Sequence, residues 1–252
     1  MTDNEKISEI VPMSKITILG SGSTNLNPAR NASSVLIRRG GNNIVFDFGR
    51  GTAIQLAKIG LLQDDVQHVI LSHYHPDHVT DLLPYLHAAS QSQIDKRTKS
   101  ITIYGQPSVS EFMTALKQPY GDNSLSKDFQ TTLLDINTGT MAINGKDFFF
   151  TDLHHSYGLS FEENGATIAV MADSKLHDDL VDALENVDLG IFDGGHLSDE
   201  EIVELAVRCK AKRLVCSHQY RELDGSSLNS AARSKGYKGE ISVAFDLMEF
   251  EI

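Results

Sequence analysis

The sequence contains no tryptophan and only two cysteines among its 252 residues. Cys209 and Cys216 are not in a C-x-x-C spacing, so no disulfide framework is expected and a reducing cytoplasm is the predicted location. No run approaches the roughly 18 consecutive apolar residues that a membrane-spanning helix needs, so no membrane association is expected. Residues 1–13 are polar and mixed in charge, which predicts a polar leader rather than a secretory signal.

Basic residues are also scarce, because 22 Lys and Arg stand against 34 Asp and Glu, for a net charge of −12. Proteins that bind polyanions usually present a basic face from which counterions are released. The one basic concentration, K-R-T-K at 96–99, is expected to be a solvated loop. The charge balance weighs against a large nucleic acid partner, although bound divalent metals would add positive charge locally.

The chain is long enough for a sizeable core, and no repeat or boundary divides it, so a single domain over 1–252 is expected. Apolar periodicity and turn signals predict paired strands early and strand–helix alternation later, which indicates an α/β fold with helix-covered sheets. The expected strands are 16–19, 34–37, 43–48, 66–71, 101–104, 131–134, 147–153, 157–162, 166–171, 188–192 and 213–216. The expected helices begin after Gly51 and Pro76 and cover 82–89, 110–116, 176–184 and 199–209. The polar stretch 118–127 is expected to be a loop.

The most informative stretch is H-Y-H-P-D-H at residues 73–78, which holds three of the ten histidines and a carboxylate directly after an apolar run. A strand that ends there would release these side chains into a turn. His73 and His75 alternate and could project to the same side, whereas Asp77 and His78 follow Pro76 and could face a second position. Imidazole and carboxylate are the ligands of zinc and similar divalent metals, so the spacing predicts a metal site.

Further ligands are expected from distant strand ends. His154 and His155 follow one predicted strand, Asp173 follows another, and His218 follows a third. Each has a simpler interpretation when taken alone, because Asp173 could cap a helix and the histidines could be exposed turn or edge residues. Their occurrence at three strand ends in one chain favours ligation.

This order of residues resembles the ligand order of the metallo-β-lactamase fold hydrolases, and the resemblance runs from about residue 14 to 250. The segments G-S-G-S at 20–23, F-D-F-G-R-G-T at 46–52 and G-H-L-S at 195–198 resemble the ribonuclease Z-like branch. The resemblance implies a four-layer αββα sandwich with two divalent metal ions, usually Zn²⁺, although Mn²⁺ or Fe²⁺ would also suit the ligands. It also implies a homodimer.

Motif positions in that family imply a role for each ligand. The third motif, H-H-S-Y-G at 154–158, is shorter than usual, so either His154 or His155 could be the ligand, and His154 is favoured. Asp47 would be a structural carboxylate beside the metal loop. The implied ligands are His73, His75 and His154 for the first metal, Asp77, His78 and His218 for the second, and Asp173 as the bridge.

These ligands predict hydrolysis by a hydroxide that bridges the two metals. Asp77 is expected to orient that hydroxide or accept its proton. His196 is the candidate proton donor to the leaving group, oriented by Asp199 or Glu200. The alternative is that His196 only caps a helix or supports His218.

The leading hypothesis is therefore a phosphodiesterase that acts on a small-molecule phosphodiester. Transfer RNA 3′-end processing ranks second, since that activity in the family depends on a long arm and residues 79–153 look filled by sheet and helix. A lactone or sulfate ester hydrolase and a binding protein without catalytic turnover on the same scaffold remain alternatives.

Overall fold

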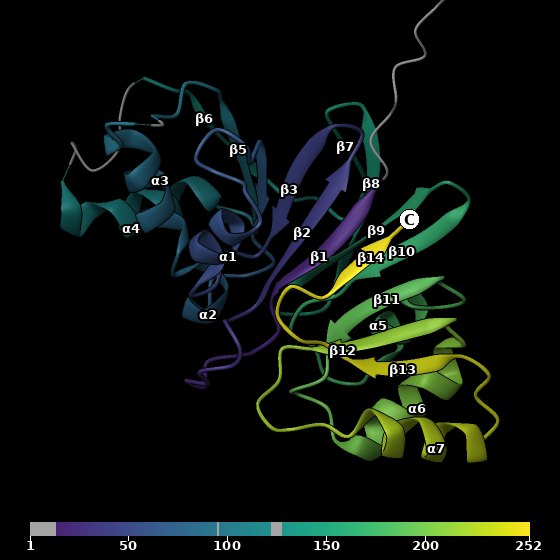
Figure 1. The fold of residues 1–252 in the computed structure, drawn as a ribbon. Helices are drawn as coiled ribbons and strands as arrows, with labels where there is room; N and C mark the ends of the chain where they lie inside the picture. The colour runs from purple at the N-terminus through teal and green to yellow at the C-terminus, as the bar shows by residue number, and fades with distance from the viewer. Residues whose placement is uncertain (1–13, 95, 122–127) are drawn as a thin grey trace, which may run out of the picture.

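The computed structural model describes residues 14–94, 96–121 and 128–252 and contains two seven-stranded sheets packed face to face (Figure 1). The polar leader expected at 1–13, and residues 122–127 of the expected loop, lie outside the described residues. The first sheet has the order β14 (Glu249–Glu251), β1 (Lys15–Gly20), β2 (Ser34–Arg39), β3 (Asn42–Phe46), β4 (His68–Ile70), β5 (Ile101–Gly105) and β6 (Thr131–Asp135). The second has the order β13 (Glu240–Val243), β12 (Arg213–Ser217), β11 (Leu189–Asp193), β10 (Ala166–Val170), β9 (Tyr157–Glu163), β8 (Lys146–Asp152) and β7 (Gly139–Ile143).

Helices cover the outer face of each sheet (Figure 1). The first sheet carries α1 (Thr52–Lys58), α2 (Pro76–Val79), α3 (Leu82–Gln91) and α4 (Val109–Lys117), followed by a 3₁₀ turn at Gln118–Tyr120. The second carries α5 (Asp178–Ala183), α6 (Asp199–Cys209) and α7 (Gly225–Ser234). The expected four-layer αββα sandwich is confirmed.

Strands such as β1, β2 and β11 are buried on both faces because each sheet lies between two layers. In β1, Ile16 and Ile18 pack into the cluster between the sheets, whereas Leu19 packs against the helices of the first sheet. In β11, Ile191 faces the other sheet and Phe192 faces the helices. Strands buried on both faces appear in sequence as continuous apolar runs rather than as alternating patterns.

The strands that lead to the candidate site are parallel to their neighbours. β3, β4 and β5 form parallel pairs in the first sheet, and β10, β11 and β12 do so in the second. The carboxyl ends of parallel strands meet at one edge of a sheet, which is where ligand sites of α/β proteins occur. The hexapeptide follows β4, while Asp173, Asp193 and His218 lie at or just after the ends of β10, β11 and β12.

Four elements were missing from the sequence interpretation: β7, α7, β13 and β14. Both cysteines are buried and free, in agreement with the expectation of no disulfide framework. Among the described residues, no helix has the length and apolar character needed to cross a bilayer.

Candidate metal centre

The hexapeptide forms a tight turn that passes from strand to helix. Pro76 is the first residue of α2, the position where its fixed φ and missing N–H are best tolerated. His73, Asp77 and His78 are buried, whereas His75, the residue before the proline, is exposed. The imidazole rings of His73 and His78 lie 4.2 Å apart, and those of His73 and His75 lie 4.5 Å apart.

A fully buried carboxylate behind this turn, that of Asp47, fixes His78. Its Oδ2 accepts a hydrogen bond from His78 Nδ1 at 2.7 Å and another from the Ser72 hydroxyl at 2.9 Å. Its Oδ1 accepts from the Ser72 backbone N–H at 2.8 Å. Because Nδ1 is engaged, His78 presents Nε2 to the interior of the site, and Asp47 has the structural role expected for it.

Asp173 lies between the two halves of the cluster. Its Oδ1 is 3.1 Å from His78 Nε2 and 3.4 Å from His218 Nε2. Its Oδ2 is 3.6 Å from His73 Nε2. Asp77 completes the buried side, with Oδ2 3.1 Å from His218 Nε2. The fold thus brings together carboxylates and imidazoles from the first sheet and from the second.

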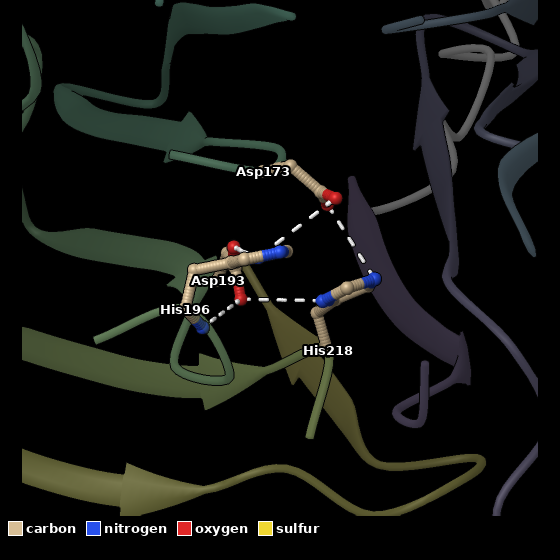
Figure 2. Close-up of side chains that lie close together, drawn as sticks. All are labelled: Asp173, Asp193, His196 and His218. Atoms are coloured by element: carbon tan, nitrogen blue, oxygen red, sulfur yellow. Dashed lines mark hydrogen bonds and ion pairs between the residues drawn. The ribbon is translucent and has the colours of Figure 1, made fainter. Parts of the chain in front are cut away.

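A second buried carboxylate, Asp193 at the end of β11, supports the site from the other side (Figure 2). It accepts a hydrogen bond from His196 Nδ1 and lies 3.2 Å from His218 Nδ1. The two imidazoles are stacked with an interplanar angle of 12°. Sequence reasoning missed Asp193, although it closes a predicted strand and precedes the G-G-H of residues 194–196.

The orienting partner expected for His196 was wrong. Asp193, not Asp199 or Glu200, holds this imidazole. Asp199 instead forms an ion pair with Arg221 at 2.6 Å. His196 Nδ1 is 3.8 Å from Asp173 Oδ2, so this imidazole lies at the edge of the cluster of candidate ligands.

The charges in the site follow from burial and from the carboxylates. Burial, together with the neighbouring His78, lowers the pKa of His73 to about 4. Burial also opposes the charged form of His218, yet hydrogen bonds to Asp193 and Asp77 raise its pKa to about 9. For Asp77, burial is outweighed by the hydrogen bond from His218, which lowers its pKa to about 2.

The donor atoms of this cluster fit divalent metal ions. His73 Nε2 and Asp77 Oδ1 are buried with no hydrogen-bond partner among the described residues, and Asp173 Oδ1 makes ion-pair contacts only. Buried polar atoms without partners are rare in folded proteins and need an explanation. Ligand atoms of His73, His75 and Asp173, and separately of Asp77, His78 and His218, lie within 4.8 Å of one another. Imidazole and carboxylate donors at this spacing suit zinc, manganese or iron.

The third-motif histidine does not join these groups. His154 is 61% exposed and its Nε2 lies 3.2 Å from Asp179 Oδ2, in a group with His177. His155 is also exposed, and its backbone carbonyl accepts a hydrogen bond from the Gln106 side chain at 2.8 Å. Ligation of the first metal by His154 or His155 therefore stays a prediction.

A cavity of about 950 Å³ opens over the cluster. Its wall includes His73, His75, Asp173 and His196. Among the lining residues that the structure describes, Lys175 is the one lysine or arginine. The cavity is large enough for a small organic molecule and has a lysine in its wall.

An αββα sandwich with histidine and aspartate side chains gathered at the shared edge of its sheets is typical of one class of metalloproteins. The family model that matches residues 27–218 is that of the metallo-beta-lactamase superfamily. The chain belongs to this superfamily.

Individual relatives agree with this assignment. A ribonuclease Z of Treponema denticola is 38% identical over 96 residues, which is 38% of this chain and 30% of that protein. The metallo-beta-lactamase fold protein YhfI of Bacillus subtilis superposes with a TM-score of 0.78 at 21% identity over 95% of this chain and 100% of that one. A diphosphatase of the PhnP family gives a TM-score of 0.72 at 17% identity over 95% and 97%.

The inferred resemblance to ribonuclease Z-like proteins is confirmed. The aligned part, however, spans less than a third of the Treponema denticola protein. The two solved structures are less similar in sequence, and their likeness concerns the fold.

Proposed function

We propose that the protein is a two-metal hydrolase that cleaves a small phosphodiester. The observation that carries the proposal is the convergence of two ligand groups on Asp173, with buried polar atoms of His73 and Asp77 that have no hydrogen-bond partner among the described residues. His73, His75 and Asp173 would hold one ion, with a third-motif histidine, His154 or His155, as the predicted further ligand. Asp77, His78 and His218 would hold the other, with Asp173 shared. When bound, the two ions would supply Lewis acidity and lower the pKa of water toward neutrality.

Asp77 orients the attacking water in this proposal rather than acting as its base. With a pKa of about 2, its carboxylate is ionised at neutral pH and has little affinity for a proton. Its Oδ2 contacts His218 at 3.1 Å, and Oδ1 is left to accept a hydrogen bond or bind a cation.

His196 is the proton donor to the leaving group. The hydrogen bond from its Nδ1 to Asp193 raises the pKa of His196, because the carboxylate stabilises the cationic form of the imidazole. Since Nδ1 is engaged, Nε2 is the nitrogen that can serve a substrate in the adjoining cavity. This imidazolium fits the role of general acid.

The charge at the cavity favours an anionic substrate. Lys175 contributes a positive charge to the wall, and metal ions would add more. The diphosphatase with a similar fold also acts on a phosphate compound according to its name, which supports phosphate chemistry.

The test is hydrolysis of bis(p-nitrophenyl) phosphate by protein reconstituted with Zn²⁺, Mn²⁺ or Fe²⁺. Asp173→Ala should abolish turnover, whereas Asp182→Ala, which removes an exposed carboxylate of α5, should leave it unchanged. Metal-loaded protein that hydrolyses no diester would refute the proposal, and lactone and sulfate ester substrates would then identify the bond that is cleaved.

Transfer RNA 3′-end processing is the second candidate, because curated relatives are ribonuclease Z proteins. The expectation against a nucleic acid partner, drawn from net charge, is therefore not supported. The described part of residues 79–153 forms α3, β5, α4 and β6 to β8, which belong to the sandwich. Cleavage of a precursor with a 3′ trailer, at a rate far above that for the small diester, would favour this candidate.

Homodimerisation also stays a prediction.

A further inference from the structure

A third group of metal-ligand side chains lies at the rim of the cavity. His154 follows β8, His177 is the N-cap residue of α5, and Asp179 lies in the first turn of that helix. His154 and His177 line the same cavity as His73 and Asp173. Segments that are distant in sequence therefore place two imidazoles and one carboxylate together.

The distances within this rim triad suit coordination of one ion. His154 Nε2 is 3.2 Å and His177 Nδ1 is 3.5 Å from the same oxygen, Oδ2 of Asp179. Bonds of 2.0–2.1 Å to a tetrahedral zinc place neighbouring donors about 3.3 Å apart. Ligand atoms of the three residues all lie within 4.8 Å of one another.

The surroundings orient both imidazoles. His177 Nε2 is hydrogen-bonded to the Ser174 hydroxyl at 2.9 Å, which directs Nδ1 toward Asp179, as a supporting hydrogen bond does for a metal-bound histidine. The Leu180 backbone N–H reaches the same Nδ1 only at 3.4 Å, a long contact that an ion would replace. The His154 backbone N–H donates to the Asp152 side chain at 2.7 Å, in a left-handed conformation with φ of 74°.

We propose that His154, His177 and Asp179 form a third metal site that binds a zinc ion separately from the binuclear centre. Two histidines and one carboxylate with an open fourth position are an established zinc ligand set. Because His154 is 61% and Asp179 is 56% exposed, the site exchanges its ion with solvent more readily than the buried centre does. An ion there would add positive charge at the entrance of the cavity. His154 is then a ligand at the rim, and the first metal of the centre is held without it.

The experiment is a metal count on the full chain, equilibrated with zinc buffered at stepped free concentrations and analysed by inductively coupled plasma mass spectrometry. Wild type should take up two equivalents at low free zinc and a third at higher free zinc. His177→Ala and Asp179→Asn should each lose only the third equivalent. Asp179→Asn guards against misfolding, since it keeps the size of the side chain and leaves the helix N-cap intact. His87→Ala, which changes an exposed histidine that lines a different cavity, is the matched control and should keep all three.

His154→Ala separates this proposal from the alternative ligand assignment. Loss of the third equivalent only, with diester hydrolysis retained, supports the rim site. Loss of one of the two tight equivalents, with full metal content in His177→Ala, overturns it and assigns His154 to the binuclear centre. Absence of a third equivalent in wild type also overturns it. Because the readout is metal content, the site can stand even if the proposed phosphodiesterase activity, on which it does not depend, fails.

Discussion

Asp193 offers the sharpest test of how the site is held together. Its side chain is 1% exposed, and it receives hydrogen bonds from His196 and His218 as well as from the backbone N–H groups of Gly195, His196 and Ser174. Truncation to alanine removes the carboxylate at Nδ1 of the buried His218 imidazolium, which keeps only its contacts through Nε2 with Asp77 and Asp173. Breaking a buried ion pair from one side costs about 3–5 kcal/mol. Asp193→Asn keeps the volume and can still accept from the backbone, so we expect about half that loss.

For a domain of this size, each kcal/mol shifts the melting temperature by about 2–4 °C. Metal-free Asp193→Ala should therefore melt about 6–20 °C below wild type in a circular dichroism scan. The metal affinity of both variants should fall about 10–100-fold, as for other residues that orient ligands. Asp193→Asn and wild type that melt together and bind zinc equally would refute the reasoning.

The pH dependence of this stabilisation has a defined direction. The pKa of Asp193 is held far below its ordinary value, because hydrogen bonds from His196 and His218 outweigh the effect of burial. Its contribution is present above the unfolded carboxyl pKa and is lost as the pH falls. The pKa of His218 is raised to about 9, so its contribution is complete below the unfolded value of about 6.5 and is lost as the pH rises through 9. The difference between wild type and Asp193→Ala should therefore be largest between about pH 4 and pH 6.5.

Three further predictions address other parts of the centre. Asp47→Ala should destabilise the metal-free protein by about 3–5 kcal/mol in urea unfolding, because His78 loses its buried partner. An unchanged unfolding midpoint would contradict the structural role of Asp47. Zinc binding near pH 7 should release protons, because the pKa of His218 is about 9 and Asp47 raises the pKa of His78 well above its ordinary value despite burial. Calorimetry in buffers of different ionisation enthalpy should then give different heats of binding. Equal heats would contradict proton release. His196→Gln should slow hydrolysis of alkyl phosphodiesters about 10²–10⁴-fold. It should affect p-nitrophenyl esters little, because p-nitrophenolate leaves without a proton. Equal losses for both substrates would rule out general acid catalysis by His196.

The sequence predicted the parts of the site that local patterns encode. The hexapeptide is continuous, and its strand and helix boundaries are marked by an apolar run and by Pro76. Asp173 and His218 could be found because each follows a short apolar strand, and the structure places both against the hexapeptide. Helix α6 has the ends that were predicted for it, and the structure shows Ser198 and Glu201 forming a capping box at its start.

The elements that sequence reasoning missed depend on tertiary contacts. β14 is three residues long and gains its conformation by pairing with β1 at the edge of the first sheet. In α7, Leu228 and Ala232 are the buried residues among glycine, serine and asparagine, which have low intrinsic helix propensity. Such segments are stabilised by the surface on which they pack, and that surface is assembled from residues far away in the chain.

The positions of Asp193 and His154 illustrate the same limit within the site. Both candidate partners of His196 on α6 are close in sequence, but the capping turn directs Asp199 to Arg221 and leaves the imidazole against β11. His154 follows a strand as Asp173 and His218 do, yet its left-handed backbone places the side chain with α5. Strand ends can be inferred from patterns, whereas the direction of a side chain in the following turn depends on one or two backbone angles.

The topology of the second sheet explains why a supporting carboxylate occurs between two of the candidate ligands. β10, β11 and β12 are parallel neighbours in sequence order, so their carboxyl ends place Asp173, Asp193 and His218 in a row along one edge. The central position is the most enclosed, which makes its carboxylate suited to orienting imidazoles rather than to binding an exchangeable ion. Asp47, in the turn that follows β3, has the same relation to His78 after β4, its parallel neighbour. Each sheet thus supplies one buried carboxylate that turns a histidine toward the other sheet, and the candidate metal centre lies where these two histidines meet, with their Nε2 atoms 3.2 Å apart.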